Sequence, residues 1–142
     1  MENFIKAVKN WENKFGKRLI NENELSCINV LGYPKSVKSK EDIKKYYSIF
    51  AGMNDSEYDD MLFSFWNYKK AIIKSKESFY ISNRLWPFAD YAYNLNIYAF
   101  SYEEKNSNAV YIVTGEQIFK IAKNLDCFFK LFLASPEQIQ IF

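Results

Sequence analysis

The hydrophobic residues of this chain change their spacing near Lys76, and this change most constrains the fold. Before Lys76, apolar residues recur every three or four positions, as they do on one face of a helix. After Lys76, short runs rich in aromatic and β-branched residues are separated by turn residues, as they are in strands. The order predicts an α+β fold, in which N-terminal helices are followed by a mainly antiparallel sheet packed with helices.

Helical spacing is clearest in two N-terminal segments. In residues 4–15 the apolar side chains follow one helical face, with Asn3 placed to cap the helix and Gly16 placed to end it. In residues 43–50 a second apolar stripe follows Ser39, which we expect to cap that helix. Further helical segments are expected at residues 25–31, after Asn67, after Asn124 and from Ser135.

Strands are expected wherever aromatic and β-branched residues form short runs between turn residues. The run at 61–66 comes first and stands between helices, and the others follow Lys76. The expected strands cover residues 61–66, 79–81, 85–91, 95–102, 109–113 and 117–122.

The chain is expected to form one domain over residues 1–142. Its 49% hydrophobic residues supply one core, and its 4 Gly and 3 Pro argue against a disordered or fibrous chain. No apolar run approaches the roughly 20 residues needed to span a bilayer, and the N-terminal stretch is charged and amphipathic. We therefore expect a cytoplasmic protein, with Cys27 and Cys127 as buried free thiols rather than a disulfide.

The residue types that most catalytic sites need are largely missing. The chain has no histidine, which removes the commonest general base and the commonest metal ligand. Its glycines are scattered singly, so no phosphate-binding loop is predicted. An enzyme would need a carboxylate pair such as Asp90 and Glu103 brought together across strands. We expect no catalysis and no cofactor.

The net charge of +2 gives no strong attraction to nucleic acid or to anionic lipid. Lysines near aromatic residues are the one local exception, and they can be interpreted as a nucleic-acid surface or as the solvated face of a short helix. We favour the solvated face, and expect no nucleic acid, no membrane, and a monomer or weak homodimer. The residues concerned are Lys69, Lys70, Lys74 and Lys76, with Trp66, Tyr68 and Tyr80.

Two segments are candidates for contact with a partner protein. The first is an acidic loop, whose carboxylates are either solvated charge or an acidic surface that faces a basic partner. The second segment follows Trp86 and Phe88, which we expect to be buried. We expect it to expose Asp90 and one or both of its tyrosines to a partner; the alternative is that the tyrosine rings cover the core. The candidate partner-binding residues are Asp55, Glu57, Asp59 and Asp60 in the first segment and Asp90, Tyr91 and Tyr93 in the second.

The stretch from Leu62 to Phe132 resembles the SUKH superfamily, also called the SMI1/KNR4 family. In that family a strand and a short helix precede a Pro-Phe-Ala turn, successive strands and a closing helix. After Asp90 the chain departs from the glycine-rich turn that is common in the family. The matching parts are Leu62-Phe63-Ser64-Phe65-Trp66, residues 67–72, Pro87-Phe88-Ala89-Asp90, Asn96-Ile97-Tyr98-Ala99-Phe100, Val110-Tyr111-Ile112-Val113 and residues 121–128.

The resemblance implies a protein that works by binding. Many bacterial members of the family resemble immunity proteins that bind and neutralise toxins, and others have regulatory roles. The first expectation is therefore an immunity protein that occludes a cognate toxin without catalysis. The alternative is a regulatory or scaffold module that binds a cellular protein or a small polar ligand.

Overall fold

Five strands between Phe63 and Ala122 form one antiparallel sheet in the computed structural model, which describes residues 2–17, 37–54, 56–103 and 108–140. Its strands are hydrogen-bonded in chain order, so each strand pairs with the next one along the sequence. Strands β2 and β5 match the expected residues 85–91 and 117–122, and β3 and β4 differ from expectation by one residue at each end. The strands are β1 (Phe63–Phe65), β2 (Leu85–Tyr91), β3 (Asn96–Ser101), β4 (Val110–Thr114) and β5 (Gln117–Ala122).

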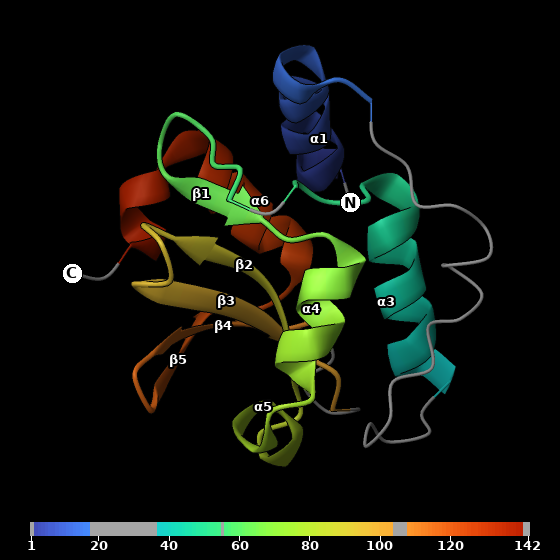
Figure 1. Ribbon diagram of the computed structural model, residues 1–142, viewed down its shortest axis with the longest axis vertical. Coiled ribbons are helices and arrows are strands. Elements are labelled where there is room, and N and C mark those ends of the chain that lie inside the picture. The colour runs from blue at the N-terminus through green and yellow to red at the C-terminus, as the bar shows by residue number, and fades with distance from the viewer. Residues whose placement is uncertain (1, 18–36, 55, 104–107, 141–142) are drawn as a thin grey trace.

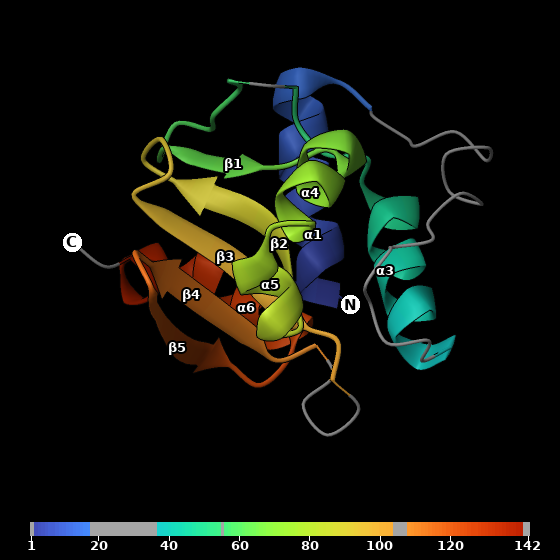
Figure 2. The same ribbon diagram turned by 60° about the horizontal axis from the view of Figure 1, so that its bottom comes forward.

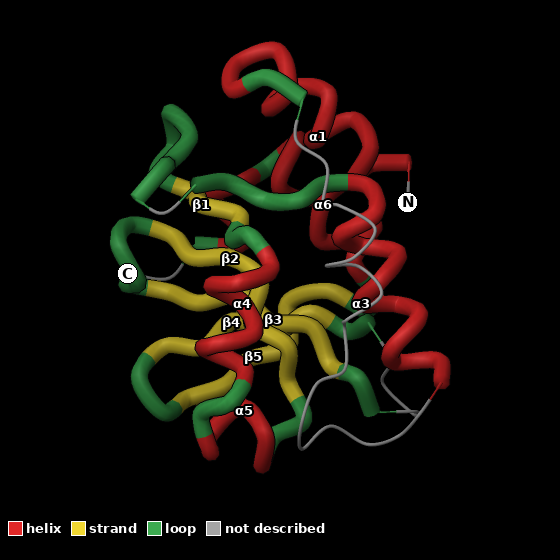
Figure 3. The backbone as a smooth tube through the Cα atoms, turned by 45° about the vertical axis from the view of Figure 1, so that its right-hand side comes forward, coloured by secondary structure: helices red, strands yellow, loops and turns green. Residues whose placement is uncertain are grey.

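Helices precede, interrupt and follow the sheet, which confirms the α+β class. Figure 1 shows α4 and α5 in front of the sheet and α1 and α6 behind it, and Figure 2 shows the same layers from another side. Figure 3 shows α3 at one side of these layers. The described helices are α1 (Glu2–Phe15), α3 (Val37–Ile49), α4 (Tyr68–Ser75), α5 (Ser78–Ser82) and α6 (Leu125–Ala134), with a 3₁₀ turn, η2 (Pro136–Ile139).

Aromatic rings from distant segments build the core between the sheet and the helices behind it. The ring of Phe129 in α6 stacks on Phe4 in α1 at 4.5 Å between centroids, and it lies 5.6 Å from Phe65 in β1. All three side chains are fully buried. Burying a side chain of this size stabilises a fold by roughly 1.5–3 kcal/mol, so this layer holds the two helices against the sheet.

The local helix signals have mixed outcomes. The side chain of Asn67 accepts a hydrogen bond from Lys70 N (2.9 Å), and that of Asn124 accepts one from Cys127 N (2.8 Å), so both predicted caps are confirmed. Gly16 ends α1 with a φ of +84°. The predicted cap at Ser39 is wrong, because α3 begins at Val37 and Ser39 lies inside the helix.

One predicted strand is a helix. Residues 79–81 lie in α5, where Tyr80 N and Ile81 N donate to the carbonyl of Glu77. A short aromatic run fits a strand or a helical turn equally well. In this chain Tyr80 packs against the sheet and is buried beside Leu85 of β2.

Two smaller expectations concern the cysteines and the membrane. Residues 25–31, with Cys27, lie outside the described residues, whereas Cys127 is a free, half-buried thiol. In the part of the chain that the structure describes, each helix is too short or too polar to cross a bilayer.

Candidate functional site

The fold brings the two candidate segments together. Strands β1 and β2 are antiparallel neighbours in which Phe63 pairs with Tyr91, so the loop before β1 meets the turn after β2. Ala92 N in that turn donates a hydrogen bond to the carbonyl of Leu62 in the loop, across 2.9 Å. Residues 56–62 and the turn 92–95 therefore lie together at one end of the sheet.

Asp90 lies beneath these two segments and is fully buried, with an exposed fraction of 0%. Its Oδ1 accepts a hydrogen bond from Trp66 Nε1 (2.5 Å), and its Oδ2 accepts from the Tyr58 hydroxyl (2.8 Å) and from Asn94 N (2.9 Å). Both oxygens therefore act as acceptors, as an ionised carboxylate requires. The buried carboxylate joins the loop, the residue that follows β1 and the turn.

The expectation that Asp90 is open to a partner is therefore wrong. Asp90 pairs with Ser64 in β1 and with Ile97 in β3, so neighbouring strands flank it on both sides. Trp66 and Tyr58 then cover it. Asp90 acts within the protein, by holding the groups around it.

The two tyrosines of this segment have opposite environments. Tyr91 is buried, and its ring lies 5.1 Å from Phe63, so it belongs to the core. Tyr93 has 68% of its surface exposed. Trp86 and Phe88 are buried as predicted. Of the three candidates in this segment, Tyr93 is the one that a partner can reach.

Tyr93 is held in place by its turn and by Tyr58. The rings of Tyr58 and Tyr93 lie 4.4 Å apart between centroids, inclined by 45°. Ala92, Tyr93 and Asn94 have φ values of 52°, 53° and 69°, in the left-handed region that costs energy for residues other than glycine. Contacts around the turn, above all the bond from Asn94 N to Asp90, stabilise it in this conformation.

The Tyr58 hydroxyl is set by its surroundings. Partial burial and the hydrogen bond to Asp90 raise the pKa of Tyr58 well above its usual range. The hydroxyl therefore stays protonated and remains a donor to the carboxylate.

The acidic loop uses its described carboxylates largely for its own structure. Asp59 Oδ1 accepts from Met61 N and from Phe63 N, each across 2.9 Å, and partial burial raises the pKa of its carboxyl. Glu57 Oε1 accepts from Asn54 N across 3.2 Å. Asp60 is exposed and forms an ion pair with Lys14 of α1, while Asp55 lies outside the described residues. Asp60 is thus the most open carboxylate of the described loop.

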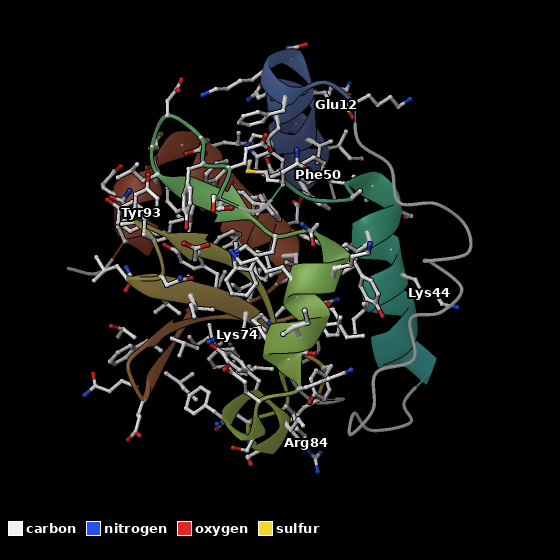
Figure 4. The ribbon with its side chains drawn as sticks, in the orientation of Figure 1. Glu12, Lys44, Phe50, Lys74, Arg84 and Tyr93 are labelled. Carbon is white, nitrogen blue, oxygen red and sulfur yellow. The ribbon has the colours of Figure 1, made fainter. Side chains whose placement is uncertain are left out.

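Exposed apolar side chains gather on the same two segments. The described part of the chain has seven large hydrophobic side chains that are exposed, and four of them lie here. Figure 4 shows Tyr93 at the rim of the molecule, on the side opposite Lys44 and α3. We call this surface the Tyr93 edge; it consists of Tyr58, Met61, Leu62, Tyr93 and Leu95.

Sequence reasoning missed Met61, Leu62 and Leu95 as surface residues. Met61 and Leu62 are included in a predicted strand, but Leu62 has a φ of +69° and the strand begins only at Phe63. Leu95 is included at the start of the next predicted strand, where it instead closes the turn through a bond from its N–H to the carbonyl of Ala92. An apolar residue next to a turn gives no sequence sign that it is exposed.

The carboxylate pair that an enzyme would need does not form. Asp90 pairs with Ile97, whereas Glu103 lies beyond Ser101, which pairs with Leu85 at the other end of β2. Four residues of β3 separate Ile97 from Ser101, which is about 13 Å. Among the described residues there is also no group of three or more side chains suited to bind a metal ion.

The lysines of α4 do not lie beside exposed aromatic rings. Lys70 Nζ lies 4.8 Å from the ring centroid of Trp66, and Lys74 forms an ion pair with Glu77 at 3.0 Å. Trp66 and Tyr80 are buried, so these two rings are not available for stacking with bases. The geometry agrees with a solvated helix face.

Comparison with known proteins adds no assignment: no family model, no curated protein and no solved structure matches this chain.

Proposed function

We propose that this chain is a non-catalytic immunity protein that binds a bacterial toxin and occludes its active surface with the Tyr93 edge. The observation that carries this proposal is the gathering of exposed apolar side chains on two segments that a buried carboxylate joins. Exposed apolar clusters are typical of protein interaction sites, because burying them on a partner removes them from water.

The Tyr93 edge has the properties of a protein-binding surface. An exposed tyrosine buries a large area on binding while it loses little side-chain entropy. Tyr93 packs on Tyr58, and the turn that carries it is hydrogen-bonded to Asp90. A surface held in this way loses less freedom when a partner binds, which favours affinity.

The choice of a toxin as the partner rests on the resemblance to the SUKH superfamily. That resemblance includes Leu62-Phe63-Ser64-Phe65-Trp66 and Pro87-Phe88-Ala89-Asp90, the two strands that bear the Tyr93 edge at their ends. The separation of Asp90 from Glu103 and the lack of histidine favour binding over catalysis. We place the protein in the cytoplasm, where it would meet a toxin that enters the cell.

The test is co-purification of the tagged chain from its native cells, with mass spectrometry of the proteins that elute with it. The proposal predicts recovery of one protein with a toxin domain, in roughly equal amount, and loss of that protein when the bait is Tyr93→Ala. Ile73→Ala is the matched control, because Ile73 is an exposed apolar residue on α4, away from this edge. Recovery of regulatory proteins instead would support the scaffold alternative. Equal recovery of the toxin-domain protein with the wild-type and Tyr93→Ala baits would contradict the proposal.

A further inference from the structure

We infer that the partner presents an arginine or lysine side chain to the open face of Tyr93. This inference rests on the proposed binding function and names the chemistry of the partner at the same surface. Its basis is the negative charge of the buried Asp90 and of the loop that packs against Tyr93 through Tyr58.

Asp90 places a carboxylate beneath Tyr58 and the turn that carries Tyr93. Its carboxylate is fully buried, and the three groups that donate to it, from Trp66, Tyr58 and Asn94, are all neutral. Within the described residues no lysine or arginine pairs with it. A buried charge is screened weakly, so its field extends to the surface that Tyr58 and Tyr93 form above it.

The loop that packs against Tyr93 carries further carboxylates. Asp60 has 90% of its side chain exposed, and its ion pair with Lys14 is on the surface and therefore weak. Asp59 lies in the same loop, and the charge of Lys14 acts on it as well. A basic partner would thus approach two carboxylates that share one lysine, and complementary charge speeds and orients such an approach.

The ring of Tyr93 is open to a partner. Tyr93 packs one side against Tyr58 and leaves most of its surface open. Cations bind to the face of an aromatic ring, and arginine does so more often than lysine. Met61, Leu62 and Leu95 lie on the same two segments, so an arginine flanked by apolar residues fits this surface best.

The experiment selects binding partners without assuming a toxin. Random short peptides displayed on phage are selected on the immobilised full chain, and those that do not bind Tyr93→Ala are kept. We expect these peptides to contain arginine or lysine beside apolar residues. Their affinity is then measured for Tyr93→Phe, which keeps the ring, and for Tyr93→Leu, which keeps only an apolar side chain.

The inference predicts that Tyr93→Phe binds within about twofold of the wild type, and that Tyr93→Leu loses roughly fivefold or more. Urea unfolding of both variants checks that the fold is intact. Two results would overturn the inference and leave the proposed function standing. One is peptides that need Tyr93 but contain no arginine or lysine; the other is peptides that bind Tyr93→Leu with the same affinity as the wild type. A selection that yields no peptide dependent on Tyr93 would count against both.

Discussion

The indole Nε1 of Trp66 donates a hydrogen bond to Oδ1 of Asp90 across 2.5 Å, and neither side chain is open to solvent. Trp66 directly follows β1, and Asp90 lies near the end of β2, next to the turn that carries Tyr93. The same carboxylate binds Tyr58 and Asn94. One buried residue therefore links the core to the surface that we propose for binding.

Removal of the Asp90 carboxylate is expected to cost far more stability than removal of an exposed one. Asp90→Ala leaves three buried or half-buried donors without their acceptor, and we expect a loss of about 3–5 kcal/mol. Asp90→Asn keeps one acceptor oxygen and should lose about 1–3 kcal/mol. Urea unfolding gives both values. Asp60→Asn is the control, with an expected change of about 0.5 kcal/mol or less, and an equally small loss for Asp90→Ala would contradict the role given to Asp90.

We expect substitution of Tyr91 to lower stability strongly, and substitution of Tyr93, the residue proposed for binding, to lower it only slightly. Tyr91→Ala removes a buried ring that contacts Phe63 and should cost about 3–5 kcal/mol. Tyr93→Ala loses its contact with Tyr58 and should cost about 1 kcal/mol. Thermal or urea unfolding of the two variants measures this difference. If Tyr93→Ala were the less stable of the two, its ring would belong to the core and the Tyr93 edge would not be a free surface.

Alkaline pH is expected to destabilise the protein. Burial raises the pKa of Tyr46, and burial followed by the charge of Tyr46 raises that of Tyr47. Unfolded tyrosines lose their proton near pH 10, whereas these residues keep it in the fold, so unfolding releases protons and stability falls as the pH rises above about 10. The free energy of unfolding should be lower at about pH 11 than at about pH 8.

The variant Tyr58→Phe identifies the part of this alkaline loss of stability that Tyr58 causes. The pKa of Tyr58 is raised in the same direction, so Tyr58→Phe should make the fall in stability with pH less steep. It should also lower stability near neutral pH by about 1 kcal/mol, because it removes the hydrogen bond to Asp90. Stability that stays constant across this pH range would show that the tyrosines are more open than the structure places them.

Gly52 is expected to tolerate no side chain. Its φ is +103°, and an added Cβ would lie 2.4 Å from the backbone of Asn67 and from the carbonyl oxygen of Trp66. The loop passes this close because the Asn67 side chain also donates to the carbonyl of Met53. Gly52→Ala should lose about 4 kcal/mol or more. Gly115→Ala, with a φ of +60° and no neighbour within 4 Å, should lose only about 1–2 kcal/mol, so equal losses would contradict the close approach at Gly52.

Local signals predicted much of the fold because they act over few residues. Asn67 and Asn124 cap the helices that follow them through bonds to residues three positions away. The run 85–91 forms β2 because its apolar residues and the turn after it both favour a strand. Ser39 failed as a cap, and residues 79–81 failed as a strand, because short segments satisfy more than one pattern.

The environment of Asp90 could not be predicted in this way. The pairing of β2 with β3 shifts between Pro87 and Ala89, and such a shift changes the side to which later side chains point. The groups that cover Asp90 come from Tyr58 and Trp66, which are 32 and 24 residues away in the sequence. The sequence indicated two candidate segments, and which of their residues face outward depends on this long-range packing.

The dissociation constant of the chain with its recovered partner tests the central claim most directly. If the Tyr93 edge is the binding surface, Tyr93→Ala should weaken binding at least about tenfold, as is typical of a central aromatic residue at an interface. Ile73→Ala, which removes an exposed apolar side chain on α4, should leave binding within about twofold of the wild type. Equal binding by the wild type and Tyr93→Ala, or a larger loss for Ile73→Ala, would contradict the account.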